Sequence, residues 1–337
     1  MISVRKAIVG AALMLALAPL TARAEAVKLL FATLTPPDYT SNTRVYAPWV
    51  EHINAIGRGV LQIDIRNGTA IANNANVYDR VDNDVMQIAV GIPGLVGGKF
   101  PLTEVVGLPF VADDAESSSV AYWRLYKTGL LDTEYKDIKP LALSMYLPQG
   151  VHLAKAPATL DDLKGIRLRV VTKLSGEVIS HLNGTPMVIE PADTFSAVQR
   201  GTVDGVVMSW AGLGQLNLLE VTSYHIEMPL GTGATMVFMS RKKYDALPVG
   251  AKKLLDDNSG ESFSRAYGHN FDRESREQRA PIDASGKHTV AHLSPAQDAH
   301  WRASIQPVID GWTASHPGGA KLLETYRALL ADVKAGR

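Results

Sequence analysis

Two arginines in the stretch GIRLRVV (residues 165–171) are the clearest candidates for chemistry in this sequence. The stretch is short, β-branched and apolar, as a buried strand is, and side chains alternate between the two faces of a strand. Arg167 and Arg169 therefore share one face. A guanidinium group offers a planar pair of donors that matches a carboxylate. The stretch thus indicates an anion site, with solvation on an edge strand and pairing with acids as the two alternatives.

The positions of the two arginines along the strand separate their expected roles. Ligands of parallel α/β sheets bind beyond the carboxyl ends of the strands, and Arg169 lies nearer to that end. From the residues alone, Arg169 is either an anion receptor or a structural charge, and the two interpretations carry equal weight. Arg167 is expected to be a solvent-facing or structural charge.

The sequence contains no recognisable catalytic motif. G-x-S-x-G, H-E-x-x-H and G-x-x-x-x-G-K-[ST] are all missing. With no cysteine, the chain has no disulfide, no thiolate metal site and no cysteine nucleophile. His288 and His292 are four residues apart, but KHTVAHLSP alternates as a strand does, which favours two solvated histidines over a metal site. We therefore expect no cofactor and no metal.

Strands that alternate with helices must position the arginines. The first half predicts strands at 27–33, 60–65 and 87–90, with helices at 42–56 and 77–81. The second half repeats this order around GIRLRVV, and YDRVDNDVMQIAV (78–90) is similar to FSAVQRGTVDGVV (195–207). A strand at ATMVFMSR and a long helical region after Pro248 follow. This alternation predicts an α/β protein with two similar lobes and largely parallel sheets.

The first 24 residues are typical of a secretory signal peptide. Arg5 and Lys6 precede an apolar run from residue 7 to residue 20, and Ala22-Arg23-Ala24 forms a small-x-small cleavage site. Cleavage would leave 31 Lys and Arg against 34 Asp and Glu, a formal net charge of −3. No long basic run remains, which argues against nucleic acid as a partner. We expect a soluble, exported protein.

Four segments carry a resemblance to a known family: LDDLKGIRLRVV (160–171), AVQRGTVDGVVMSW (197–210), EVVGLPFVADDAE (104–116) and NGTAIANNANVYDRV (67–81). From roughly Val27 to the C-terminus, the chain resembles the solute-binding proteins of tripartite ATP-independent periplasmic (TRAP) transporters, the DctP-like family. The resemblance implies a periplasmic-binding-protein fold with two α/β lobes, crossing strands and a long connecting helix. Residues 25–147 with about 236–280 would form lobe I, and 148–235 with about 281–330 would form lobe II.

The resemblance also implies a set of ligand-binding residues: Arg169, Trp210, His152, Gln149, Asn74 and Tyr78. Arg169 matches the family's carboxylate-binding arginine. Many members have an arginine near His152, so this histidine is either a substitute donor or a structural imidazole. Trp210 is either a stacking wall for the ligand or ordinary core.

The expected function is that of a periplasmic receptor. It captures a small organic acid by its carboxylate, closes by hinge motion and delivers the acid to the permease subunits of a TRAP transporter. Many members of the family carry acidic residues in the segment that holds Asn74 and Tyr78. Their absence here, together with the presence of Trp210, favours a monocarboxylate or 2-oxo acid, with aromatic acids among the candidates. A monomer is expected because lobe closure needs free surfaces. The alternatives are an exported hydrolase or lyase whose carboxylate substrate docks on Arg169, and a ligand sensor of the same fold.

Overall fold

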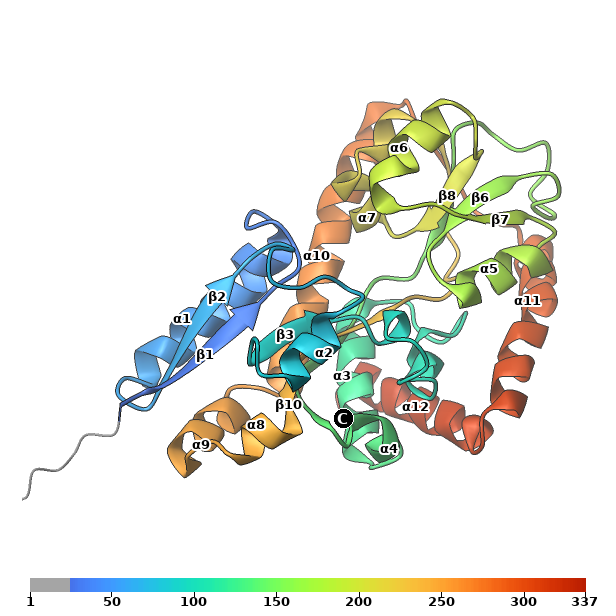
Figure 1. Cartoon of the computed structure of the whole chain (residues 1–337). Coiled ribbons are helices and arrows are strands. Elements are labelled where there is room, and N and C mark those ends of the chain that lie inside the picture. Colours follow the sequence, from blue (N-terminus) through green and yellow to red (C-terminus); the bar gives the residue numbers. More distant parts are fainter. Residues whose placement is uncertain (1–24) are drawn as a thin grey trace, which may run out of the picture.

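The computed structural model describes residues 25–337, except for the side chains of residues 192 and 283. The predicted signal peptide lies outside this range. Two sheets form two lobes, which lie one above the other in Figure 1. No helix within residues 25–337 is long and apolar enough to cross a bilayer.

The sheet of the first lobe has the strand order β2-β1-β3-β10-β4. Its strands are β1 (Val27–Ala32), β2 (Leu61–Arg66), β3 (Ile88–Gly91), β4 (Ile138–Met145) and β10 (Ala234–Ser240). β1 pairs in parallel with β2 and β3, whereas β10 is antiparallel to both β3 and β4. The strands predicted at 27–33, 60–65 and 87–90 are confirmed to within one residue at each end.

The sheet of the second lobe has the order β11-β9-β5-β8-β6-β7. Its strands are β5 (Gly150–Leu153), β6 (Arg167–Val170), β7 (Thr185–Val188), β8 (Gly205–Met208), β9 (Tyr224–Ile226) and β11 (Thr289–Ala291). β6 is parallel to β7 and β8, and β9 is parallel to β11. β5 is antiparallel to β8 and β9. Both β5 and β10 enter their sheets directly from the other lobe, without the helical crossover that makes successive strands parallel.

Helices cover both sheets. The first lobe carries a π-helix (Asn42–Tyr46), α1 (Ala47–Ile56), α2 (Val77–Asp82), α3 (Ala115–Lys127), α4 (Asp132–Tyr135), α8 (Arg241–Asp245), α9 (Val249–Asp257) and 3-10 turns at Pro93–Leu95 and Thr103–Gly107. The second lobe carries α5 (Lys173–His181), α6 (Pro191–Gln199), α7 (Trp210–Gln215) and a 3-10 turn at Leu218–Glu220. The units α2–β3 and α6–β8 match the two similar sequence segments. Each unit ends in a strand that is parallel to an earlier strand of its sheet, β3 to β1 and β8 to β6.

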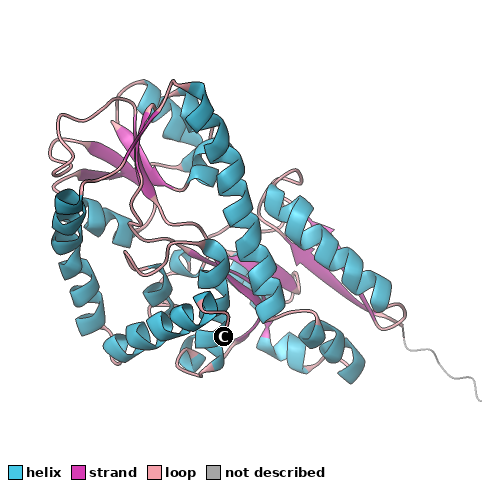
Figure 2. Cartoon of the chain, turned by 180° about the vertical axis from the view of Figure 1, so that it is seen from behind, coloured by secondary structure: helices cyan, strands magenta, loops and turns pink. Residues whose placement is uncertain are grey.

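The long helix α10 (Glu261–Ser285) runs past both lobes (Figures 1 and 2). It packs against α3 and β4 of the first lobe and against α7 of the second. The buried Glu274 accepts hydrogen bonds from the Thr40 hydroxyl (2.8 Å) and from the Gln215 amide (3.0 Å). One carboxylate on α10 therefore holds a loop of the first lobe and a helix of the second.

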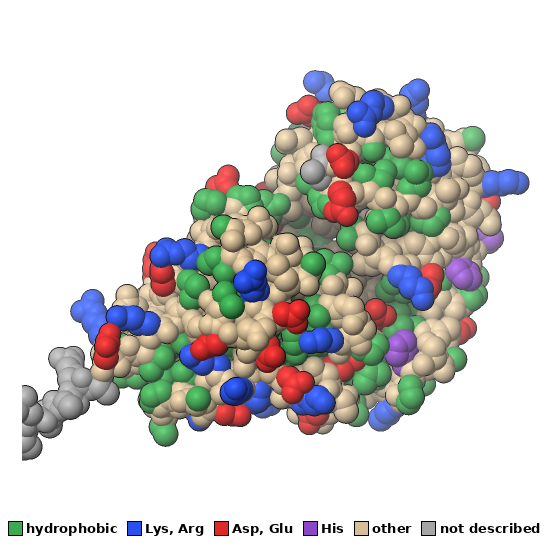
Figure 3. All heavy atoms as spheres, in the orientation of Figure 1, with side chains coloured by type: hydrophobic (Ala, Val, Ile, Leu, Met, Phe, Trp, Pro, Cys, Tyr) green, Lys and Arg blue, Asp and Glu red, His purple; other side chains and the backbone are tan. Residues whose placement is uncertain are grey.

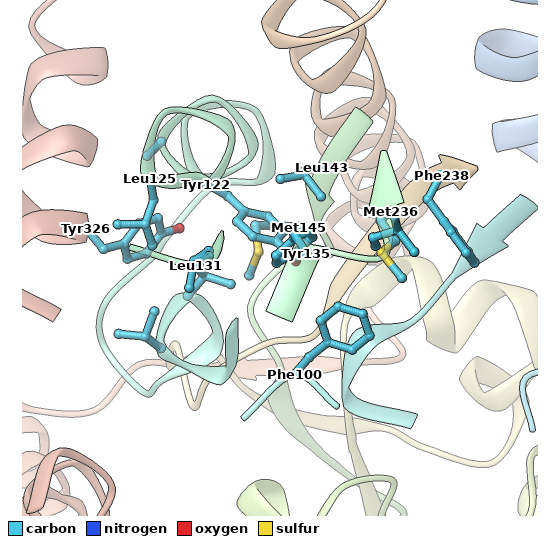
Figure 4. Close-up of a cluster of buried hydrophobic side chains, with 14 of the residues drawn as sticks. Phe100, Tyr122, Leu125, Leu131, Tyr135, Leu143, Met145, Met236, Phe238 and Tyr326 are labelled. Carbon is cyan, nitrogen blue, oxygen red and sulfur yellow. The ribbon is translucent and has the colours of Figure 1, made fainter. Parts of the chain in front are cut away.

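The last two helices connect the second lobe back to the first. α11 (Pro295–Ser315) packs against α5, and α12 (Gly319–Lys334) packs against α3. Figure 4 shows Tyr326 of α12 beside Tyr122 and Leu125 of α3 in the first-lobe core. This position differs from the expectation that residues up to about 330 belong to lobe II, because the apolar face of α12 is buried on α3.

Candidate functional site

A row of paired residues crosses the second sheet and places the candidate side chains on one face. His225 pairs with His152, His152 with Val206, Val206 with Arg169, and Arg169 with Met187. Residues paired across neighbouring strands point to the same side of a sheet. Arg169 and His152 are thus separated by two strand spacings, about 10 Å.

Arg169 is a buried cation with unused donors. The residue is only 2% exposed, and its Nε donates to the carbonyl of Ile189 at 3.0 Å. Its two terminal NH2 groups make no hydrogen bond to any part of residues 25–337. Burial lowers the pKa of Arg169, and the charge of Glu190 opposes this shift. Guanidinium nevertheless stays charged in proteins, so the two NH2 groups are available to an anion.

Arg167, on the same face, is a structural charge as expected. Its Nε and Nη2 bind the two carboxylate oxygens of Asp204 at 3.0 and 2.8 Å, and Nη2 also donates to the Gly201 carbonyl. The ion pair lowers the pKa of Asp204. The carboxylate also accepts from the backbone N–H of Arg167, which ties the start of β6 to the start of β8.

The close approach of β5 explains the Asp-Gly pair at the start of β8. A Cβ atom on Gly205 would lie 2.2 Å from the His152 carbonyl oxygen and 2.9 Å from the Leu153 Cα. No side chain fits there, so β5 and β8 can pair only with glycine at this position. The V-D-G pattern recognised in the sequence therefore builds the strand pair that carries His152.

His152 is engaged at both ring nitrogens. Its Nε2 lies 3.0 Å from the Met208 carbonyl oxygen, and its Nδ1 lies 3.0 Å from Nδ1 of His225. Nε2 of His225 in turn lies 3.0 Å from Nδ1 of His288. Burial lowers the pKa of His152 to about 4. Both ring nitrogens of the neutral His152 thus have partners within the protein, so the neutral ring offers no free N–H to a ligand.

His288, which we expected to be solvated, is only partly exposed and has a protein partner at one ring nitrogen. Parallel pairing of β11 with β9 brings His288, directly before β11, against the buried His225, with the two rings stacked at 5.2 Å. His292 is exposed, as expected. The three histidines bind one another directly, and no group of metal-ligating side chains in residues 25–337 is arranged to hold a metal ion.

Trp210 is held at the beginning of α7 by three side chains. Its indole N–H donates to Glu227 Oε1 at 2.9 Å, and the Arg279 guanidinium lies 4.9 Å from the ring centroid. Arg279 also donates to the same oxygen of Glu227 at 2.9 Å. The His152 ring meets Trp210 edge-on at 4.9 Å. Trp210 is therefore half-buried in a defined orientation beside the histidine.

A cavity of about 250 Å³ opens between the lobes at this point. Figure 3 shows a hollow between the upper and lower parts of the molecule. The lining combines apolar side chains of both crossing segments with polar groups: Leu147, Pro148, Met208, Met228, Pro229, Trp210, His152, Ser275, Asp113 and Glu227. Asp113 and Glu227 are the acidic side chains among these lining residues.

Gln149 lies in the crossing segment between β4 and β5. Its side-chain oxygen accepts from the Ser175 hydroxyl at 3.0 Å, in the first turn of α5. Its backbone N–H donates to the Gly231 carbonyl of the other crossing segment. Gln149 thus joins both crossing segments to the helix that follows β6, on the side of the sheet where β6 ends.

Asn74 and Tyr78 lie on the first lobe, and no contact in residues 25–337 joins either one to Arg169 or His152. Asn74 is exposed in the loop before α2. Tyr78 is buried against Phe238 (5.7 Å, stacked) and Phe100 (5.9 Å, edge-on), which raises its pKa to about 12. Ligand contact by these two residues stays a prediction that depends on closure of the lobes.

Sequence reasoning missed Glu227, Arg279 and His225. Glu227 and Arg279 are 52 residues apart, and His152 and His225 are 73 residues apart. Glu227 and Arg279 belong to no motif that the sequence displays, and a lone histidine in a strand is ordinary. No signal in a single sequence would have selected these residues.

The fold and the cavity define a two-lobed solute-binding protein. A family model described as "Bacterial extracellular solute-binding protein, family 7" (DctP) matches residues 31–315, and the chain belongs to this family. The predicted family and the predicted two-lobed α/β fold are thereby confirmed. The family and its structural neighbours are solute receptors, which favours the receptor over the hydrolase or lyase considered as an alternative.

Three relatives illustrate the similarity. The outer membrane transporter protein TsaT of Comamonas testosteroni is 26% identical over 97% of this chain and 98% of its own length. A TRAP solute-binding protein from Rhodoferax ferrireducens, solved with copurified benzoate, is 27% identical with a TM-score of 0.82, covering 92% and 100% of the two chains. A marine metagenome TRAP protein specific for aromatic acids, solved with 3-hydroxybenzoate, is 26% identical with a TM-score of 0.82, covering 91% and 99%.

Proposed function

We propose that this protein is the periplasmic receptor of a TRAP transporter and binds a small organic monoanion, by its carboxylate, on Arg169. The observation that carries the proposal is the buried guanidinium of Arg169, whose two terminal NH2 groups have no partner in residues 25–337. A buried charge is costly unless it is paired. A planar carboxylate matches the two free donors.

The remainder of the ligand is proposed to be apolar, with an aromatic acid or an aromatic 2-oxo acid as the favoured class. The cavity lining is largely aliphatic and aromatic. The acidic side chains of Asp113 and Glu227 disfavour a second carboxylate as long as His152 is neutral, as it is at pH 7 with a pKa of about 4. The aromatic acids bound by the two relatives of 26% and 27% identity support this class.

Capture and release would follow from hinge motion, and no covalent bond would be made or broken. The crossing segments at 146–149 and 227–233, together with α10, connect the lobes. The closed, loaded monomer would then be recognised by the membrane permease. A sensor of the same fold would bind the same ligand, and only the dependence of uptake on the permease would separate the two functions.

A thermal-shift screen of residues 25–337 tests this proposal. The protein is first unfolded and refolded to remove any copurified ligand. The panel contains benzoate, 3-hydroxybenzoate, phenylpyruvate, succinate and glucuronate. A ligand at about 100 times its Kd adds roughly 2.7 kcal/mol to the free energy of unfolding, which raises the Tm by several degrees.

The variant Arg169→Ala is expected to abolish the shift, while Arg167→Ala, two residues away on the same face, retains it. A shift that survives in Arg169→Ala would show that the arginine is structural. A panel without any hit would overturn the organic-acid receptor. Recovery of the bound acid unchanged after prolonged incubation distinguishes the receptor from a hydrolase or lyase, which would convert it.

A further inference from the structure

Three imidazole rings form a continuous chain from the interlobe cavity to the surface of the second lobe. His152 lines the cavity, His225 is fully buried, and His288 is partly exposed directly before β11. Successive ring nitrogens are 3.0 Å apart at both junctions. The chain ends at the Met208 carbonyl, 3.0 Å from His152 Nε2.

This geometry determines which nitrogen carries each proton. A carbonyl oxygen only accepts, so the proton of His152 is on Nε2 and its Nδ1 is an acceptor. His225 must therefore donate from Nδ1, which leaves its Nε2 as the acceptor for the N–H on Nδ1 of His288. The free Nε2 of His288 completes the chain as an acceptor. All three rings are neutral in this arrangement, and each of the two hydrogen bonds between the rings contains one proton.

One added proton can cross the chain without breaking any of its hydrogen bonds. It binds Nε2 of His288, whose Nδ1 proton moves to Nε2 of His225. The Nδ1 proton of His225 then moves to Nδ1 of His152. His288 and His225 are neutral again, now protonated on Nε2, and His152 carries the positive charge. Both hydrogen bonds between the rings are kept, but in each of them the donor nitrogen and the acceptor nitrogen have exchanged roles.

The surroundings of His152 decide when this charge is stable. Desolvation disfavours it, and the cation Arg279 of α10 likewise disfavours a positive charge on the neighbouring His225. The carboxylates of Glu227 and Asp113 line the same cavity but are paired with Arg279 and Lys334, and the Trp210 ring lies edge-on at 4.9 Å. An anionic group of a ligand next to His152 would add the missing counter-charge. The backbones of His152 and Arg169 are about 10 Å apart in the row across the sheet.

We propose that His152 determines specificity in the cavity, and that His225 and His288 supply the proton that charges it when a ligand with a second anionic group binds. A monoanion binds with His152 neutral, whereas a dianion binds together with one proton. This inference rests on the proposed function, since it takes Arg169 as the site of the first carboxylate. The path itself depends only on the geometry of the three rings.

The first experiment tests the path without any ligand. Two-bond 15N–1H spectra of the histidine-labelled protein at pH 7 report the tautomer of each ring. We expect the proton on Nε2 of His152 and on Nδ1 of both His225 and His288. A proton on Nε2 of His225 in the ligand-free protein would overturn the proposed path.

The second experiment measures proton uptake by calorimetry at pH 6.5 in buffers of different ionisation enthalpy. The probes are benzoate, a monoanion, and terephthalate, a dianion of similar width. Terephthalate is expected to bind with uptake of about one proton and benzoate with none. The Kd of terephthalate should then rise by up to about tenfold for each unit of increase in pH, because one proton binds together with it.

The variant His152→Gln should abolish the proton uptake, whereas the variant His292→Gln, which replaces an exposed histidine directly after β11, should retain it. Uptake that persists in His152→Gln would overturn the role of His152 in specificity. So would terephthalate that fails to bind at pH 6 while benzoate binds. If neither probe binds, the proposed function fails for these acids, and the tautomers still decide the proton path.

Discussion

Arg169 and His152 lie on the same face of the second sheet, each paired with Val206 of the strand between them. One is a cation at every physiological pH, and the other is a neutral imidazole at the inner end of a chain of three histidine rings. The sheet thus holds a permanent positive charge on Arg169 and, by our proposal, a conditional one on His152, with the two backbones about 10 Å apart. In the proposed function, Arg169 recognises the carboxylate and His152 discriminates between ligands by the rest of their structure.

The substitution Arg169→Lys should weaken the binding of benzoate by about 10- to 100-fold although it preserves the charge. Lysine cannot offer two parallel N–H donors to one carboxylate. The matched substitution Arg167→Lys should change the Kd less than twofold, because Arg167 binds Asp204 at the other end of the strand. Calorimetric titration of both variants checks this prediction, and an unchanged Kd in Arg169→Lys would contradict it.

Removal of the Glu274 carboxylate should loosen the connection between the lobes. Glu274→Ala deletes the acceptor for Thr40 and Gln215 and leaves both donors without a protein partner, at a cost of about 1–3 kcal/mol. Hydrogen exchange should accelerate in residues 40–46 and 210–216. Glu277→Ala, one turn further along the exposed side of α10, should cost about 0.5 kcal/mol or less. Equal losses in the free energy of urea unfolding for Glu274→Ala and Glu277→Ala would contradict the role of Glu274 as a bridge between the lobes.

The ligand-free protein should lose stability as the pH falls from about 6.5 toward 4. Burial lowers the pKa of His152 to about 4 and that of His225 to about 3. Below about 6.5 the unfolded chain binds two protons that the folded chain does not. The free energy of unfolding therefore falls by up to about 2.7 kcal/mol for each pH unit of acidification, which is the value for two protons.

Urea unfolding between pH 7.5 and 5 measures this slope. The variant His152→Gln should remove about half of the excess slope, and the exposed control His292→Gln should leave it intact. A free energy of unfolding that is independent of pH over this range would show that the two rings are already charged in the folded state.

Alanine at position 205 should destabilise the second lobe by about 2–4 kcal/mol. Its Cβ would lie 2.2 Å from the His152 carbonyl oxygen, so β8 would have to move away from β5. Gly94→Ala is the matched control, because no atom lies within 4 Å of the position of its Cβ. Urea unfolding of both variants decides the point: a Gly205→Ala protein as stable as Gly94→Ala would mean that β5 can shift without cost.

The local parts of the fold could be predicted from the sequence. Alternation and apolar spacing located the strands that carry Phe31 and Leu168 and the helix that carries Tyr78, because the periods of strands and helices leave a direct pattern. The same alternation put Arg167 and Arg169 on one face. The antiparallel insertion of β5 and β10 left no such pattern, since strand direction depends on where the chain crosses between lobes.

The sequence by itself determined the family, the two α/β lobes and the choice of Arg169 as a receptor candidate, because these depend on contiguous motifs and on residue periodicity. Only the tertiary structure decided that Arg167 is bound by Asp204, that Glu227 and Arg279 hold Trp210, and that His288 reaches His152 through His225. These contacts join strands and helices that are distant along the chain. Their energies come from pairing and burial in the folded state, which no local pattern encodes.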